Sequence, residues 1–195
     1  MIIVITGTPG TGKTEIAQAL AKKLDLHLIE IKKIVEINKS LYKVKNKEKE
    51  VDLRKLRHLI LNETKKASDL QPKTYSIIIE GHLACELRLP TKFVFVLRCA
   101  PQILKRRLEK RKYSKEKVEE NLLAEMLDYC TLLARKNFKG KQIIEIDTSK
   151  RSLENCVEEI TKVIKGKKKK IDDVDYSKEL EEYARGKKPY ARDII

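Results

Sequence analysis

The chain has 195 residues, of which 41% are hydrophobic and 37% charged, and its formal net charge is +15. This length fits one domain with a sizeable core and an appended tail, while no apolar run is long enough to cross a bilayer. We therefore expect a globular cytoplasmic protein with no membrane segment. The positive charge favours either a polyanionic partner, such as RNA, ribosomes or nucleotides, or a lysine-rich solvated surface.

The cysteines lie far apart in apolar stretches, without a C-x-x-C pair, at Cys85, Cys99, Cys130 and Cys156. This spacing predicts buried free thiols in a reducing cytoplasm, not disulfides or a cysteine metal site. Met1 leads straight into an apolar run, so we expect no signal peptide.

Apolar runs and helical spacing alternate along the chain. Short runs rich in β-branched residues predict buried strands at about 2–6, 27–31, 75–82, 92–99 and 142–148. Apolar residues at helical spacing predict helices at about 13–24, 52–68, 101–111, 114–137 and 152–164. Pro101 suits a first helical turn, and Ser114 and Ser152 suit N-caps. The polar stretch 32–51 fits neither pattern.

Alternating strands and helices predict an α/β fold, an open five-stranded parallel sheet with helices on both faces. Ligands bind such sheets at the carboxyl ends of the strands. Thr6, Gly7, residues 80–82 and Arg98 all fall at strand ends, so we expect them to meet on one edge. Residues 166–195 begin with a lysine run and contain a short helical stretch near 177–185. We interpret them as a basic, mixed-charge tail that is ordered only if it docks.

The segment GTPGTGKT, Gly7–Thr14, matches G-x-x-x-x-G-K-[ST] between a predicted strand and a predicted helix. Its glycines let successive backbone N–H groups turn inward around phosphate oxygens, and the helix N-terminus adds partial positive charge. Lys13 is expected to reach the β- and γ-phosphates, and the Thr14 hydroxyl to take a place on Mg²⁺. The segment predicts a P-loop NTPase fold, a three-layer sandwich that binds a nucleoside triphosphate, and leaves the acceptor open.

The rest of the chain favours a small kinase among P-loop proteins. It contains no Asn-Lys-x-Asp base reader of a GTPase, and it is too short for a large motor ATPase. A kinase must offset charge on the transferred phosphoryl group. Arginines for that task follow the fourth predicted strand, at Arg98, Arg106, Arg107 and Arg111. Taken singly, each also fits a solvated helix face.

Three stretches together resemble the adenylate kinase isoenzyme 6 family, the small, divergent adenylate kinases of the CINAP type. These stretches are GTPGTGKT, IIIEGHLACELRLP (77–90) and FVFVLRCAPQILKRRLEKRKYSKEKVEENLLAE (93–125). The resemblance covers about residues 1–164. It implies an adenylate kinase-like domain over 1–165, with a monophosphate-binding segment at about 30–50 and a short lid at about 110–120.

The resemblance also implies roles for individual residues. The ATP phosphates would be held by Gly10, Gly12, Lys13, Thr14 and the backbone N–H of Glu15. Glu80 would hold Mg²⁺ through water, where the family usually has Asp. His82 would take part in the chemistry, and Arg111 would contact ATP as a catalytic cation. Lys112 stands where the lid commonly has Gly.

The segment at 30–50 lacks the arginine that commonly grips the AMP phosphate. Candidates to take the place of that arginine on the acceptor side are Lys32, Lys33, Lys39, Arg98 and Arg107. A lysine there would act as a point charge, without the fork of an arginine.

Two functions follow, and one site could serve both. The first is an AMP kinase that converts ATP and AMP into two ADP with Mg²⁺. The second, implied by the family and favoured by the charge of +15, is an ATPase in small ribosomal subunit maturation that binds a platform ribosomal protein and pre-ribosomal RNA. A P-loop kinase for a sugar or shikimate-like acceptor is a third alternative. A monomer is expected.

Overall fold

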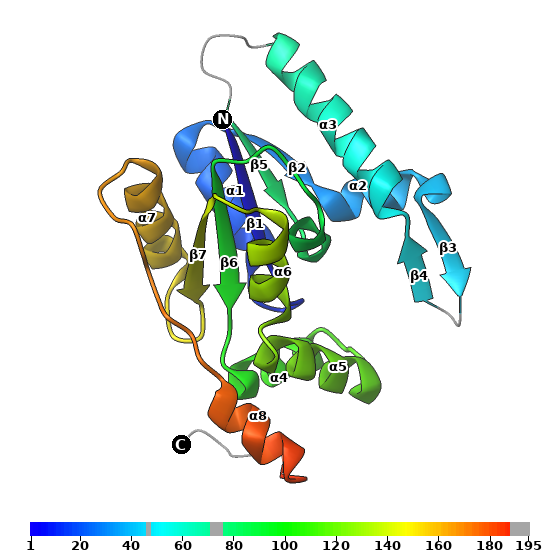
Figure 1. The fold of residues 1–195 in the computed structure, drawn as a ribbon, viewed down its shortest axis with the longest axis vertical. Coiled ribbons are helices and arrows are strands. Elements are labelled where there is room, and N and C mark those ends of the chain that lie inside the picture. Colours follow the sequence, from blue (N-terminus) through cyan, green and yellow to red (C-terminus); the bar gives the residue numbers. More distant parts are fainter. Residues whose placement is uncertain (46–47, 71–75, 188–195) are drawn as a thin grey trace.

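The computed structural model describes residues 1–45, 48–70 and 76–187, and its centre is a parallel five-stranded sheet (Figure 1). The strands lie in the order β2-β5-β1-β6-β7. They comprise β1 (Ile2–Gly7), β2 (His27–Glu30), β5 (Ile77–Glu80), β6 (Phe93–Arg98) and β7 (Gln142–Asp147). All five strands predicted from the sequence are present; β1 is one residue longer than expected, and the other four are shorter.

Helices cover both faces of the sheet, which confirms the three-layer α/β fold. One layer contains α1 (Lys13–Leu24) and α7 (Leu153–Ile164); the other contains α3 (Leu53–Leu70), η2 (His82–Glu86) and α6 (Tyr129–Asn137). Side chains alternate along β1, so Ile3 and Ile5 pack with the first layer while Val4 packs with the second. Two separate apolar cores therefore lie on the two faces of the sheet.

The stretch that the sequence left unassigned contains several short elements. A helix, α2 (Ile31–Ile37), follows β2 directly, and η1 (Lys39–Leu41) follows it. An antiparallel pair, β3 (Tyr42–Lys45) and β4 (Glu48–Val51), then projects away from the central sheet beside α3 (Figure 1). Each strand is only four residues long, and three successive charged residues (48–50) precede Val51 in β4, so the sequence pattern did not reveal the pair.

The predicted continuous helix over 114–137 is wrong. The structure contains α5 (Lys115–Met126) and α6 with a break between them, where Asp128 adopts a left-handed φ of 54°. An Asp128 carboxylate oxygen accepts a hydrogen bond from Arg98 Nη2 at 2.5 Å, and this long-range contact holds the break. The Ser114 cap is confirmed, since its hydroxyl accepts the N–H of Lys117.

Arg98, at the end of β6, is a buried cation with three carboxylate partners. Its guanidinium contacts Glu125 Oε1 at 2.8 Å, Glu145 Oε1 at 2.6 Å and Asp128. Burial opposes the charge of Arg98, but the neighbouring carboxylates outweigh burial and raise its pKa. The other oxygen of Glu125 accepts the Thr8 hydroxyl of the P-loop at 2.5 Å, so the cluster reaches the phosphate-binding loop.

The described part of the C-terminal segment docks on the domain. Arg151 pairs with Asp172, whose backbone bridges Glu145 on β7. The ring of Tyr176 is buried with Arg98 stacked over it at 5.2 Å, and α8 (Ser177–Ala184) packs near α5. The helical stretch predicted near 177–185 is thus present. Residues 188–195 lie outside the described part.

All four cysteines are free and buried, as their spacing predicted. None of the helices that the structure describes has the length and apolar content needed to traverse a bilayer.

Replacing Arg98 by Met should strongly destabilise the fold. The change leaves Glu125, Asp128 and Glu145 without their shared cation, and breaking a buried pair in this way costs about 3–5 kcal/mol. Urea unfolding measures the loss, with Arg135→Met on the exposed side of α6 as the matched control, expected within about 0.5 kcal/mol of the parent. A loss for Arg98→Met as small as that of the control would contradict this role of Arg98.

Candidate functional site

The loop between β1 and α1 is shaped for phosphate. Gly10 and Gly12 have left-handed φ values of 92° and 90°, and a Cβ on Gly10 would lie 2.8 Å from a methyl group of Leu104. Other residues would be strained there. The Lys13 ammonium curls back to donate to the Thr8 carbonyl at 2.9 Å. Burial lowers the pKa of Lys13, and the nearby Glu80 and Glu125 carboxylates partly oppose that shift.

Thr14 and Glu80 form a pair of oxygen ligands beside the loop. The Thr14 hydroxyl donates to Glu80 Oε1 at 3.3 Å, while Glu80 Oε2 is buried without a hydrogen-bond partner among the described residues. Burial raises the pKa of Glu80, against the opposing effect of Lys13. A hydroxyl with a buried, incompletely paired carboxylate is a hard-oxygen donor set that fits Mg²⁺.

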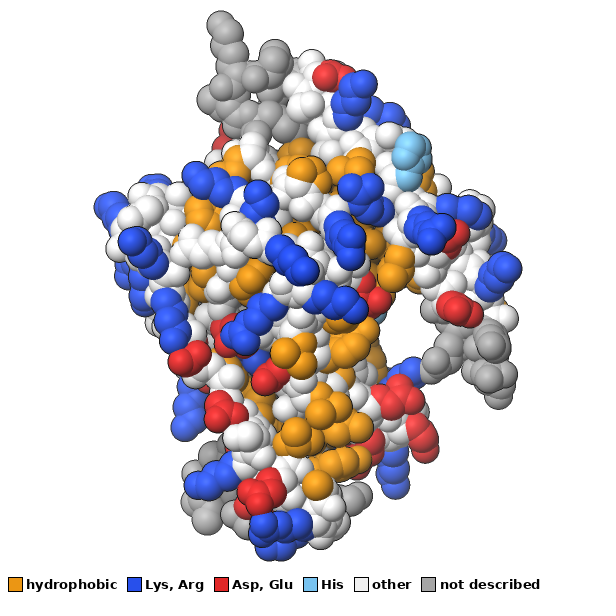
Figure 2. Space-filling view, viewed as in Figure 1, with side chains coloured by type: hydrophobic (Ala, Val, Ile, Leu, Met, Phe, Trp, Pro, Cys, Tyr) orange, Lys and Arg blue, Asp and Glu red, His pale blue; other side chains and the backbone are white. Residues whose placement is uncertain are grey.

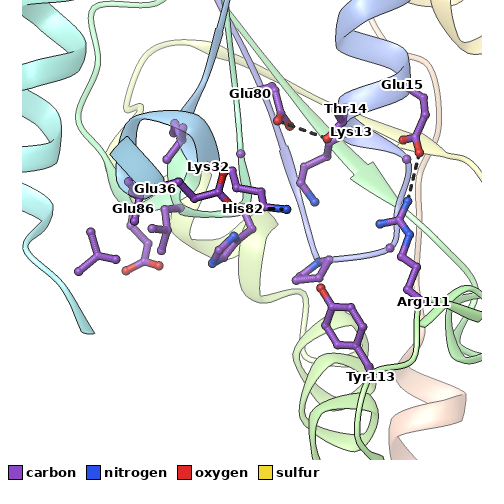
Figure 3. Close-up of a pocket in the computed structure, with 18 of the residues that line it drawn as sticks. Lys13, Thr14, Glu15, Lys32, Glu36, Glu80, His82, Glu86, Arg111 and Tyr113 are labelled. Atoms are coloured by element: carbon purple, nitrogen blue, oxygen red, sulfur yellow. Dashed lines mark hydrogen bonds and ion pairs between the residues drawn. The ribbon is translucent and has the colours of Figure 1, made fainter. Parts of the chain in front are cut away.

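A cavity of about 590 Å³ opens from the loop toward α2. Figure 3 shows Lys13 and Thr14 on one side of it, Lys32, Glu36 and Glu86 on the other, and His82 between them. The imidazole is reached by solvent, yet partial enclosure by the cavity walls and the Lys13 ammonium lower the pKa of His82 to about 4. His82 is therefore neutral at neutral pH.

The far side of the loop faces α4 (Pro101–Lys110) and the turn after it. Arg111 pairs with the Glu15 carboxylate at 3.1 Å, and both side chains are exposed (Figure 3). Tyr113 also lines the cavity. A second hollow of about 550 Å³ lies behind the loop, bounded by Arg107, Arg111 and Arg151.

The structure separates the five acceptor-side candidates. Lys32 lines the cavity, whereas Lys33 pairs with the buried Glu30 and Lys39 lies in η1 outside the cavity lining. The expectation that Arg98 serves the acceptor side is wrong, because Arg98 is buried in the carboxylate cluster and cannot reach an acceptor.

Arg107, the other arginine considered for the acceptor side, does not line the cavity that reaches α2. It donates to the Thr148 carbonyl at 2.7 Å and lines the hollow on the opposite side of the loop from α2.

Sequence reasoning missed several cavity residues. Glu36, Glu86 and Tyr113 line it with apolar side chains of α2, β4 and the start of α3. Only the helical spacing of α2 could have indicated that Lys32 and Glu36 share a face, one turn apart. The Thr8–Glu125 contact, which joins residues 117 apart in the chain, has no local sequence signal.

Comparisons with known proteins agree with this geometry. A family model described as "AAA domain" matches residues 3–128. A protein of Methanocaldococcus jannaschii named "Putative adenylate kinase" is 39% identical over 186 residues, covering 94% of this chain and 97% of that protein. One of the same name from Pyrococcus furiosus is 35% identical, covering 98% of each chain.

Solved structures share the fold at low identity. A shikimate kinase from Acinetobacter baumannii in complex with shikimate has a TM-score of 0.59 and 18% identity, covering 86% of this chain and 94% of that one. A deoxyadenosine kinase from M. mycoides has a TM-score of 0.54 and 20% identity, covering 85% and 100%. These likenesses show the fold alone.

The raised pKa of Glu80 predicts a pH dependence of stability without nucleotide or Mg²⁺. A carboxyl group with a folded pKa above its unfolded value binds more protons in the folded state. Stability therefore falls as pH rises from the ordinary glutamate pKa, about 4.3, through the raised one. Urea unfolding across this range measures how the free energy of unfolding changes with pH. Glu80→Gln should remove the part of the decrease that Glu80 causes, and Glu63→Gln, at an exposed position on α3, should retain it. An unchanged slope in Glu80→Gln would contradict the prediction.

Proposed function

This chain belongs to the AAA-domain family and to the family of the "Putative adenylate kinase" proteins of M. jannaschii and P. furiosus, and we propose that it is a nucleotide kinase that transfers the γ-phosphoryl group of MgATP to AMP. The observation that carries the proposal is the single cavity of about 590 Å³ that joins the phosphate loop to α2. Donor and acceptor can meet within it, on the two sides of Lys13.

The donor is held by the loop. Backbone N–H groups from Gly10 to Glu15 surround the β- and γ-phosphates, and the Lys13 ammonium leaves the Thr8 carbonyl for the phosphate oxygens. Arg111 leaves its ion pair with Glu15 and contacts the phosphates instead, which its exposed position allows. Thr14 and Glu80 would hold Mg²⁺, Glu80 through water. The metal would neutralise charge on the phosphates.

The acceptor enters from α2. An oxygen of its phosphate attacks the γ-phosphorus in line as the bond to the leaving β-phosphate oxygen breaks, which yields two ADP. Lys32 is the acceptor-side lysine that lines the cavity, and it acts as a point charge. The side chains of Ile31, Val35, Val51 and Leu53 offer an apolar wall to the base. Residues 30–50 serve as the monophosphate-binding segment and 110–120 as the lid.

Water is a second candidate acceptor, which would make the protein an ATPase. Neutral His82 lies in the cavity near Lys13, and its lowered pKa leaves a ring nitrogen free to accept a hydrogen bond from water. The family resemblance links such turnover to small ribosomal subunit maturation. Phosphate release without AMP, and its loss in His82→Ala, tests the hydrolysis. Co-sedimentation with ribosomal subunits at low salt, with and without ATP, tests the partner.

Lys13→Ala should lower ADP formation from ATP, Mg²⁺ and AMP by at least about 100-fold, since the change removes a donor aimed at developing charge. Lys23→Ala, an exposed lysine near the other end of α1, is the matched control and should retain activity. A coupled assay with each nucleoside monophosphate in turn identifies the acceptor. Turnover that no monophosphate stimulates, or full activity in Lys13→Ala, would overturn the kinase proposal.

A further inference from the structure

The edge of the sheet opposite the phosphate loop carries a concentration of unpaired positive charge. The segments that run into β6 and β7, residues 87–92 and 138–141, contain four cations and no carboxylate. Together with Arg57 on α3, these cations form a group that we name the basic edge: Arg57, Arg88, Lys92, Lys139 and Lys141. All five side chains are exposed.

The cations of the basic edge have no anionic partner in the described part of the chain. No ion pair within 4.0 Å joins any of the five to a described carboxylate, whereas Lys117 of α5 and Lys162 of α7 each pair with a carboxylate on their own helix. Arg57 Nε donates to the Arg88 carbonyl at 2.7 Å, which fixes one side of its guanidinium while the residue stays exposed. Their charge is available to a ligand.

The surface between these cations is hollowed. A depression of about 310 Å³ is bounded by Arg57, Arg88, Lys139 and Lys141, and a second of about 530 Å³ by Lys92 and Lys141. The two share Pro90 and Lys141, so they lie next to each other along the edge. Figure 2 shows Lys and Arg side chains gathered over the upper part of this face, toward the end where β6 begins, and acidic ones mainly lower down.

The lysine run after α7, residues 165–170, reaches the same edge. Gln142, the first residue of β7, donates through its side-chain amide to the Lys169 carbonyl at 2.5 Å. The exposed Lys167 and Lys169 thus extend the basic edge beyond Lys141. Cations from α3, two strand-entry segments and the turn after α7 therefore lie along this edge.

We propose that the basic edge binds the phosphate backbone of a nucleic acid, independently of the nucleotide cavity at the other edge of the sheet. A row of unpaired cations along these depressions fits a chain of regularly spaced phosphates. The described lining contains no exposed aromatic side chain on which a base could stack, so recognition rests on the backbone and is independent of base sequence. ATP occupies the opposite edge and does not compete.

Fluorescence anisotropy with labelled single-stranded and duplex RNA of mixed sequence tests the proposal between about 50 and 200 mM salt. The test variant combines Arg88→Gln, Lys139→Gln and Lys141→Gln. The matched control combines Lys22→Gln, Lys23→Gln and Lys178→Gln, which remove the same charge from exposed positions on α1 and α8. The test variant should bind at least about tenfold more weakly, with the slope of log K against log salt reduced by about 2. The control should stay within about twofold of the parent.

Three outcomes would overturn the proposal. These are no binding at the lowest salt, equal losses in the two triple variants, and tighter binding to phosphatidylserine vesicles than to RNA. Thermal unfolding of each variant excludes loss of fold as the cause. Lys13→Ala should bind RNA normally, and the basic-edge variant should retain nucleotide turnover, so failure here is distinguishable from failure of the kinase proposal.

Discussion

The Arg98 guanidinium joins three parts of the protein that are distant in sequence. Its contacts with Glu125, Asp128 and Glu145 fix the break between α5 and α6 and tie both to β7. Tyr176 of the C-terminal segment lies against it, and Glu125 carries the connection onward to Thr8 of the phosphate loop. A buried cation of this kind stabilises only when every carboxylate around it is satisfied, so the whole corner must form together. The shape of the phosphate loop therefore depends on packing far from the nucleotide.

The nucleotide cavity is built from charges held at an energetic cost. Burial lowers the pKa of Lys13 and raises that of Glu80, so it disfavours the charged form of each group. The attraction between the two opposite charges partly offsets this effect. The buried oxygen of Glu80 has no partner in the described residues, and the Lys13 ammonium is satisfied by a loop carbonyl. A bound metal ion and phosphates would relieve both costs at once, which would couple their binding. On the α2 side of the cavity, carboxylates outnumber cations, because Lys32 shares the lining with Glu36 and Glu86.

The two edges of the sheet differ in electrostatic character. At the carboxyl edge, cations and carboxylates are interleaved around the cavity, as positioning of a metal and phosphates requires. At the amino edge, the segments that enter β6 and β7 contribute cations and no carboxylate. A parallel sheet makes this separation natural, because all its strands begin on one edge and end on the other. The sheet can therefore carry a site for a small ligand at one edge and a site for a polyanion at the other.

The sequence alone determined the sheet, the phosphate loop and the caps at Ser114 and Ser152. These features depend on short-range patterns: apolar runs, helical spacing and the glycines of residues 7–14. It also placed Glu80 at a strand end, on the same edge of the sheet as the phosphate loop. Only the tertiary structure decided the fate of Arg98, the break at Asp128, the β3–β4 pair and which lysine of α2 faces the cavity. Each of these depends on contacts between distant residues, and a local pattern cannot show whether an arginine at a strand end will meet three carboxylates or a phosphate.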